Sequence, residues 1–279
     1  MLLKQASAQN IHLEILRRAA FALSGGEDTY DLLTEHQNLW TAALGEGLVS
    51  NRLDLAQTYL LTRLRALPQN QIRGIDTLYL LSPSKEAADE LVKIIRCQNS
   101  STIIGPEDLP IGRFDDPTSC MIRFWWDEVS LDSQPDAPIM PIVNLDEQLA
   151  SYETLQVKDA CGQALYLELI RQRNFNAYDG EEIFAGLLAL REHWNAVMLD
   201  ALGVAYLDTE GHVLHKLQWL KAGWGLPDDN LYILAKGQSS AEILSQQPWP
   251  DTVKVIKCNR LNKFIDLAPE QCLVSMWWD

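Results

Sequence analysis

The sequence predicts an α/β protein built by tandem duplication of one small unit, with the two units packed about a pseudo-two-fold axis. Two observations lead to this prediction. The pattern Cys-x-x-x-x-Trp-Trp-Asp occurs at Cys120–Asp127 and again at Cys272–Asp279, and a pair this unusual indicates an internal repeat. In addition, helical and strand-like hydrophobic patterns follow one another in the same order in the two halves of the chain.

Further matches upstream of each pattern support the duplication. The segment Asp76–Ser82 matches Asp229–Ala235, and the segment Ile11–Arg17 matches Leu165–Arg171. The spacing between matching positions drifts by only about two residues from end to end. The period is far longer than a solenoid repeat, so it indicates two small domains of one fold.

The expected domain boundaries follow from these matches. Between the two units, Ser133–Pro141 is rich in proline and reads as an extended connector, with a short helix expected from Asp146. We therefore expect a first repeat unit at 1–128, an acidic connector with a short helix at 129–156, and a second repeat unit at 157–279.

Each unit is expected to begin with three helices. An apolar stripe at helical spacing favours a helix over 11–24, and a second stripe, from Tyr30 through Trp40 to Leu44, favours a helix closed by the glycines that follow it. Pro68 ends the third helix, which is expected from about 54 to 67. The matching helices of the second unit are expected near 160–174, 181–200 and 209–222.

Strand, helix and strand patterns follow, and then a final strand. The short apolar run Thr77–Leu81 predicts a buried strand, and Ser82-Pro83 predicts the start of a helix to about Cys97, with Ser82 as its N-cap. A strand-helix-strand order favours a parallel pair with a right-handed crossover. The remaining strands are expected at 102–104 and 120–126 in the first unit, and near 230–235, 253–258 and 272–278 in the second.

Composition and charge restrict the function classes. The chain has 279 residues, 47% of them hydrophobic, which is enough to bury a sizeable core. It carries 23 Lys and Arg against 38 Asp and Glu, a net charge of −15. Such a field repels phosphate backbones, so we expect no nucleic-acid partner. The simpler alternative is that the negative charge only keeps the chain in solution and does not attract a basic partner.

The cysteine pattern and the hydropathy indicate a reducing, cytoplasmic setting. The five cysteines include no Cys-x-x-Cys pair, so buried free thiols are expected. The residues after Met1 lack the apolar core of a signal peptide. No apolar run approaches the roughly 20 residues of a membrane span, so no membrane association is expected.

The repeated Trp-Trp-Asp strands offer the first candidate site. Alternate residues of a strand point to opposite faces. One face is apolar in both copies: Cys120, Ile122, Phe124 and Trp126, and Cys272, Val274, Met276 and Trp278. The other face is mixed, so Trp125, Asp127, Trp277 and Asp279 are candidate partner-binding residues, tryptophan being enriched in binding hot spots. The structural alternative is that a helix or the sister unit covers Trp125 and Trp277, so that they bind no partner.

The turns after the first strand of each unit offer a second candidate. Helix N-termini present amide groups to anions, which makes these turns possible ligand sites. The residues concerned are Ser82, Ser84, Lys236, Gly237 and Ser239. Ordinary helix starts explain them as well, with Ser239 and Glu242 as a capping box. Neither turn has a Walker or Gly-x-Gly-x-x-Gly pattern.

Other chemistry-bearing residues carry weaker signals. His212-x-x-His215 has only Glu210 nearby as a third ligand, so no metal site is expected. The carboxylates at Glu107-Asp108 and Asp115-Asp116 fall in a segment rich in proline and glycine, which indicates a solvated loop and not an acid-base pair. No nucleophile motif occurs, so we expect neither a catalytic residue nor a cofactor.

These features favour a non-enzymatic protein-binding protein, such as an adaptor, an inhibitor or an immunity-type protein, that uses acidic and tryptophan-bearing surfaces. The alternative is an enzyme or small-ligand sensor with an anion or nucleotide site in the cleft between the units. An accessible Trp125 or Trp277 favours the first class, and a polar pocket with perturbed pKa values favours the second.

Overall fold

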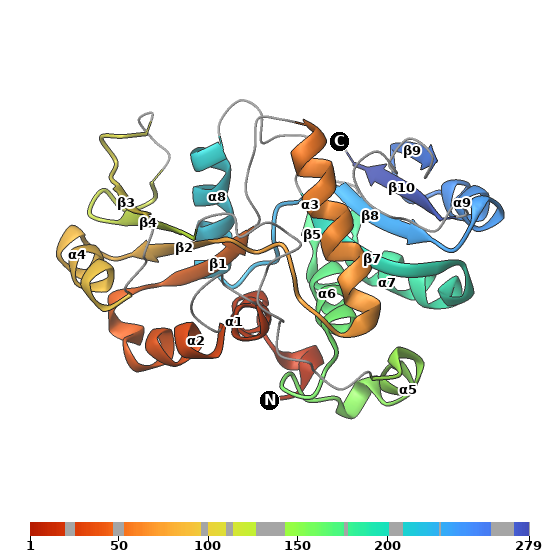
Figure 1. The fold of residues 1–279 in the computed structure, drawn as a ribbon, viewed down its shortest axis with the longest axis horizontal. Coiled ribbons are helices and arrows are strands. Elements are labelled where there is room, and N and C mark those ends of the chain that lie inside the picture. Colours follow the sequence, from red (N-terminus) through yellow and green to blue (C-terminus); the bar gives the residue numbers. More distant parts are fainter. Residues whose placement is uncertain are drawn as a thin grey trace.

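The protein has an α/β fold with two four-stranded antiparallel sheets (Figure 1). The computed structural model describes residues 1–19, 26–46, 53–95, 100–109, 114–126, 143–175, 178–200, 209–228, 230–257 and 271–278. Within these ranges, no helix has both the length and the apolar character needed to cross a membrane.

The first sheet has the strand order β1-β2-β4-β3, and every neighbouring pair is antiparallel. Its strands are β1 (Ala42–Glu46), β2 (Thr77–Ser82), β3 (Ser100–Ile104) and β4 (Cys120–Trp125). All residues of β1 and β2 are buried, which explains why β2 reads as a continuous apolar run.

The second sheet has the corresponding order β7-β8-β10-β9, again antiparallel throughout. Its strands are β7 (Trp194–Asp200), β8 (Asn230–Ala235), β9 (Thr252–Lys257) and β10 (Cys272–Trp277). A two-stranded pair, β5 (Asn174–Phe175) with β6 (Tyr178–Asp179), lies between α6 and α7 in the chain.

The described α-helices are α1 (Ala8–Arg18), α2 (Gly26–Glu35), α3 (Leu53–Ala66), α4 (Lys85–Ile94), α5 (Leu145–Ala150), α6 (Gly162–Gln172), α7 (Gly180–Ala189), α8 (Thr209–Lys221) and α9 (Gln238–Ser245). Short 3-10 helices occur at Leu3–Gln5, Gln37–Leu39, Leu67–Gln69, Tyr152–Thr154 and Arg191–His193. The predicted helix over 11–24 ends earlier, because the backbone at Ala19 is already extended.

The prediction of three consecutive helices in each unit is wrong at the second helix. That helix ends at Glu35 in the first half and at Ala189 in the second, and the residues after it form the edge strands β1 and β7. A short buried apolar run fits a helical period as well as a strand, so the stripe to Leu44 could not separate the two. Each half therefore holds four strands of its sheet.

The predicted parallel pair is also wrong. Strand β4 lies between β2 and β3 and is antiparallel to both. The two strands joined by α4 therefore run in the same direction, as their connection requires, but they are not hydrogen-bonded to each other. The same arrangement holds for β8 and β9 around β10.

The two sheets exchange a helix. Helix α3, from the first half of the chain, packs against β7 and β8 of the second sheet, and α8, from the second half, packs against β1 and β2 of the first. Figure 1 shows α8 beside the first sheet and α3 beside the second. We call this arrangement the helix exchange. It explains why one continuous hydrophobic core includes residues of both sheets.

Helices α1 and α6 pack together between the sheets and bind the opposite half of the chain. The Arg18 guanidinium donates to the carbonyl oxygens of Ala160 and Lys158, which precede α6. In return, the Gln172 amide donates to the Ala6 carbonyl oxygen, which precedes α1, at 2.7 Å. These bonds, like the helix exchange, hold the two halves against each other.

Equivalent contacts recur in the two halves. The indole N–H of Trp40 donates to Leu33 and that of Trp194 donates to Leu187, both at 2.8 Å. Gln9 on α1 donates to and accepts from the backbone of Ala43 in β1. On α6, Gln163 makes the same two bonds to Val197 in β7.

The apolar face predicted for the repeated strands is confirmed. All its members are buried: Cys120, Ile122, Phe124, Trp126, Cys272, Val274, Met276 and Trp278. The described cysteines, which are Cys120, Cys161 and Cys272, are buried free thiols, as the sequence predicts.

Candidate functional site

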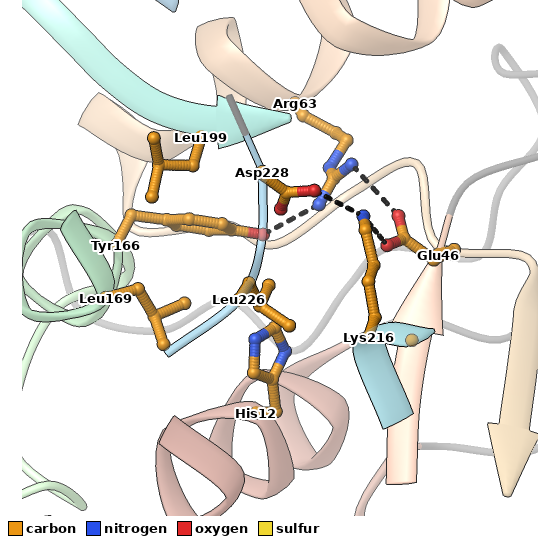
Figure 2. Close-up of a pocket in the computed structure, with 10 residues that line it drawn as sticks. His12, Glu46, Arg63, Tyr166, Leu169, Leu199, Lys216, Leu226 and Asp228 are labelled. Carbon is orange, nitrogen blue, oxygen red and sulfur yellow. Dashed lines mark hydrogen bonds and ion pairs between the residues drawn. The ribbon is translucent and has the colours of Figure 1, made fainter. Parts of the chain in front are cut away.

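Ionisable side chains from both halves of the chain converge next to the helix exchange (Figure 2). We call this set the buried charge cluster. It consists of His12 on α1, Glu46 at the end of β1, Arg63 on α3, Tyr166 on α6, Lys216 on α8 and Asp228 before β8. Because α3 and α8 cross to opposite sheets, they bring the two cations to one place.

The cluster is held together by ion pairs. The Lys216 ammonium lies 2.7 Å from Glu46 and 2.9 Å from Asp228. Arg63 lies 3.9 Å from Glu46, a weaker contact, and donates to the Tyr166 hydroxyl at 3.1 Å. Lys216 is 3% exposed and Asp228 is 1% exposed. Two carboxylates thus balance two cations, which is the condition for keeping charges out of water.

The electrostatics of Asp228 show how strongly the cluster is coupled. Burial opposes ionisation of Asp228, but Lys216 and His212 together hold its pKa well below its ordinary value. The carboxylate is therefore charged at neutral pH. The Arg173 guanidinium also donates to the Asp228 carbonyl oxygen, which fixes the backbone at this point.

His12 differs from the other members of the cluster. It is 5% exposed, and neither ring nitrogen has a hydrogen-bond partner among the described residues. Burial lowers the pKa of His12 to about 4. The nearby Glu46 carboxylate raises this pKa, but the Lys216 ammonium lowers it again and offsets the effect of Glu46. The imidazole is therefore neutral at neutral pH.

A cavity of about 20 Å³ lies beside His12, lined by the cluster and by Gly45, Leu169, Leu199 and Leu226. A volume of this size has room for about one water molecule. Sites for small organic ligands occupy several hundred Å³. The cavity beside His12 is therefore too small for a nucleotide or a metabolite.

The predicted anion turns lie elsewhere and contribute no residue to this cavity. Ser82 is fully buried at the end of β2, and its hydroxyl donates to the Leu39 carbonyl oxygen at 2.8 Å. The prediction that Ser82 caps the next helix is wrong: Ser84 is the N-cap of α4 and accepts from the amide of Ala87. Ser82 still belongs to β2, where it pairs with Cys120 of β4, so the helix begins later than expected.

In the second half, α9 begins at Gln238, after Gly237. Lys236 and Ser239 are exposed, and Gly237 is half-buried. The expected capping box of Ser239 and Glu242 does not form, because Ser239 already lies within the first turn of the helix and Gly237 has no side chain to cap it.

Trp125 and Trp277 occupy equivalent strand ends. Trp125 closes β4 opposite Thr77 and Ser100, and Trp277 closes β10 opposite Asn230 and Thr252. Both indoles are half-buried. The other two predicted partner-binding residues, Asp127 and Asp279, lie outside the described residues.

A tryptophan that the sequence reading missed is more exposed. Trp224, just after α8, is 58% exposed. Its ring meets that of Trp219 edge to face, with centroids 5.3 Å apart and planes at 85°. We call these two indoles the aromatic corner. They border a hollow of about 520 Å³, which is also lined by Gln172, Gly223 and Gly225.

The chain around Trp224 explains its position. Helix α8 ends at Lys221, and Gly223 adopts a φ of +79°, which favours glycine. A Cβ atom at Gly225 would lie 3.1 Å from the Gln172 carbonyl oxygen, so glycine lets the chain pass close to the end of α6. The available sequence signal was a tryptophan between two glycines directly after a predicted helix.

The histidines near α8 have other contacts. His212 lies 3.8 Å from Asp228, and His215 meets Trp219 edge to face at 5.4 Å. Glu210, the suggested third ligand, pairs with Arg123 at 3.1 Å. Among the described residues, no group of three or more His, Cys, Asp or Glu side chains is arranged to hold a metal ion.

The loop carboxylates stabilise turns. Asp108 accepts from the amide of Gly105 at 2.8 Å. Asp116 accepts from the amide of Thr118 at 2.9 Å and from its hydroxyl at 2.7 Å, and these bonds lower the pKa of Asp116. Local hydrogen bonding of this kind is typical of aspartates in loops.

The chain has no significant match in comparisons with protein-family models, with curated proteins and with solved structures.

Proposed function

We propose that the chain is a non-enzymatic binding protein that engages a protein partner through acidic, tryptophan-bearing surfaces. The observation that carries the proposal is the exposure of Trp224 at 58% beside a hollow of about 520 Å³. Tryptophan is enriched in the hot spots of protein interfaces, where it fills pockets and excludes water. Trp125 and Trp277, both half-buried, are proposed as further contact residues.

The pairing within the buried charge cluster supports a structural role for that cluster. Lys216 is engaged by both carboxylates, and Arg63 contacts Glu46 and Tyr166. The adjoining cavity has room for about one water molecule. A substrate therefore has no space beside the groups that would act on it, which favours binding at the surface over catalysis at the cluster.

The net charge of −15 favours a basic protein surface over nucleic acid as the partner. An adaptor, an inhibitor or an immunity-type protein fits this description, and we propose a cytoplasmic setting for it.

We further propose that the fold arose by tandem duplication, with units 1–128 and 157–279 related by a pseudo-two-fold axis. The recurring strand order, the paired indole bonds of Trp40 and Trp194, and the paired amide bonds of Gln9 and Gln163 support this origin. The helix exchange fits the same origin, because it also occurs in domain-swapped dimers.

Affinity capture tests the proposed function. The tagged full chain is used to capture proteins from a lysate of its source organism, beside Trp224→Ala and the double variant Trp125→Ala/Trp277→Ala. Ile243→Ala, which removes another exposed apolar side chain on α9, is the matched control. A stoichiometric protein that is retained by the wild type and the control, and lost from a folded tryptophan variant, is the expected result.

Recovery of only a small molecule, or of nothing at all, would count against a protein partner. The alternative, an enzyme or a small-ligand sensor, would then move ahead. One cleft between the units could not include both turns, because α4 and α9, the helices that follow Ser82 and include Ser239, lie at opposite ends of the molecule (Figure 1). A thermal-shift screen of the full chain with nucleotides and metal ions would test that alternative.

A further inference from the structure

We infer that the aromatic corner receives a cationic side chain, arginine or lysine, from a basic segment of the partner. This inference rests on the proposed function, and it adds where the partner is contacted and which type of side chain the partner inserts. It assigns the hollow beside Trp219 and Trp224 as the point of entry for that side chain.

The geometry of the corner suits a cation. Two indole planes at 85° to each other, with centroids 5.3 Å apart, form two walls at a right angle. The face of an aromatic ring attracts a cation, and tryptophan does so most strongly. Trp224 is 58% exposed, so its ring is reachable from solvent. The two glycines of the lining, Gly223 and Gly225, carry no side chains into the hollow.

The charges near the corner favour the same occupant. His215, which meets the ring of Trp219, has its pKa lowered by burial and by His212, and is therefore uncharged at neutral pH. Asp115 is close enough to His215 to act on it electrostatically, whereas Asp116 already has a cation of this chain, Lys221, close enough to act on it. Asp115 thus adds a negative charge near α8, in a chain with a net charge of −15.

A basic occupant is favoured over a purely apolar one by this combination. An apolar segment would gain from the indole walls alone, whereas an arginine or lysine also gains from the ring faces, from Asp115 and from the field of the whole chain. The partner segment is therefore expected to carry its cation on a flexible or protruding stretch that reaches into the hollow.

The test uses the full chain labelled with ¹⁵N and three short, capped peptides of glycine and serine that differ only at their central residue. That residue is arginine, the uncharged norleucine or glutamate. The indole N–H signals of the nine tryptophans report where each peptide binds, and Trp219→Phe and Trp224→Phe assign the two signals of the corner.

The arginine peptide is expected to shift the Trp219 and Trp224 signals, with an affinity about two- to fivefold higher than that of the norleucine peptide. Trp224→Ala should remove these shifts, Asp115→Asn should weaken binding, and Ile243→Ala should leave it unchanged. Equal binding of arginine and norleucine peptides, or shifts confined to other tryptophans, would overturn the inference.

The outcomes separate this inference from the proposed function. If the full chain captures a stoichiometric protein that Trp224→Ala still retains, and the arginine peptide leaves the corner signals unmoved, the protein-binding function stands and the cation site is wrong. If the arginine peptide binds at the corner while no protein is captured, the corner binds cations and the proposed function is wrong.

Discussion

The Lys216 ammonium lies 2.7 Å from the Glu46 carboxylate, although 170 residues separate them in the chain. The contact joins α8 of the second half to β1 of the first, at the point where the helix exchange brings them together. Lys216 also lies 2.9 Å from Asp228, so one cation serves two buried carboxylates.

Replacing Lys216 by methionine should therefore be costly. Lys216→Met keeps the length of the side chain but leaves Glu46 and Asp228 without their nearest cation. Removing one partner from a buried ion pair costs about 3–5 kcal/mol. We expect a loss of this size in the free energy of unfolding, measured by urea denaturation at neutral pH.

Lys221→Met, at the exposed end of the same helix, is the matched control and should change the free energy of unfolding by less than about 0.5 kcal/mol. Adding Glu46→Gln to Lys216→Met should restore part of the loss, because it removes one uncompensated charge. A Lys216→Met protein as stable as the control variant would contradict the proposed role of the cluster.

His12 should make stability depend on pH in a defined window. Its pKa is lowered from 6.5 to about 4 in the folded chain. Between these values the unfolded chain binds a proton at this residue and the folded chain does not, so the folded state loses stability as the pH falls from 6.5 towards 4. The total effect is about 3 kcal/mol.

His12→Leu should remove this part of the pH dependence, because leucine does not titrate, and should change the stability at pH 7 only slightly. The measurement is the free energy of unfolding in urea at several pH values from about 7 to about 4.5. His215→Gln is measured in parallel, because burial also lowers the pKa of His215 and this residue therefore contributes to the same pH dependence. Asp228 contributes only below its ordinary pKa of 3.8, outside this window. An unchanged slope in His12→Leu would show that other groups are responsible.

The helix exchange predicts that cutting the connector leaves the protein assembled. The test is made with a protease recognition site inserted within 129–142 and cleavage under native conditions. The two fragments should remain together in size-exclusion chromatography, because α3 and α8 each pack on the opposite sheet and Arg18 and Gln172 bind across the halves. Their separation should require denaturant.

The control for this cleavage is the uncut chain carrying the same inserted site, which should elute at the same volume. Fragments that separate without denaturant would show that the halves are independent domains joined only by the connector. That result would also remove the support that the helix exchange gives to duplication by domain swapping.

The sequence predicted those elements whose hydrophobic pattern is local. The strands β8 and β10 and the helices α6 and α8 lie within a few residues of their expected bounds. The edge strands β1 and β7 were missed, because mostly apolar segments of five and seven residues after a helix have no period that marks them as strands. The sequence matches between the two halves, by contrast, were visible because they need only a comparison of the chain with itself.

The buried charge cluster could not have been predicted in this way. Arg63 and Lys216 sit on helices whose polar residues would normally face solvent. They are buried only because each helix crosses to the opposite sheet, and that choice depends on contacts more than a hundred residues apart. Trp224 is different: its flanking glycines were a local signal for an exposed turn.

The final prediction concerns the glutamines that cover the edge strands. Gln163 on α6 is 1% exposed and makes two 2.9 Å bonds to the backbone of Val197 in β7. Gln163→Leu leaves a buried N–H and a buried carbonyl without these partners, at a cost of about 2–4 kcal/mol. Gln9→Leu removes the equivalent bonds to Ala43 but should cost less, because Gln9 is only half-buried and water reaches it.

Urea denaturation of both variants, with Gln238→Leu on the exposed start of α9 as the control, gives the comparison. Both glutamine variants should be less stable than the control, with Gln163→Leu the more affected. If only one of them differs from the control, the two edge strands do not depend on their helices in the same way. A loss in both variants is what the proposed duplication predicts, because each edge strand then relies on an equivalent glutamine to satisfy its backbone.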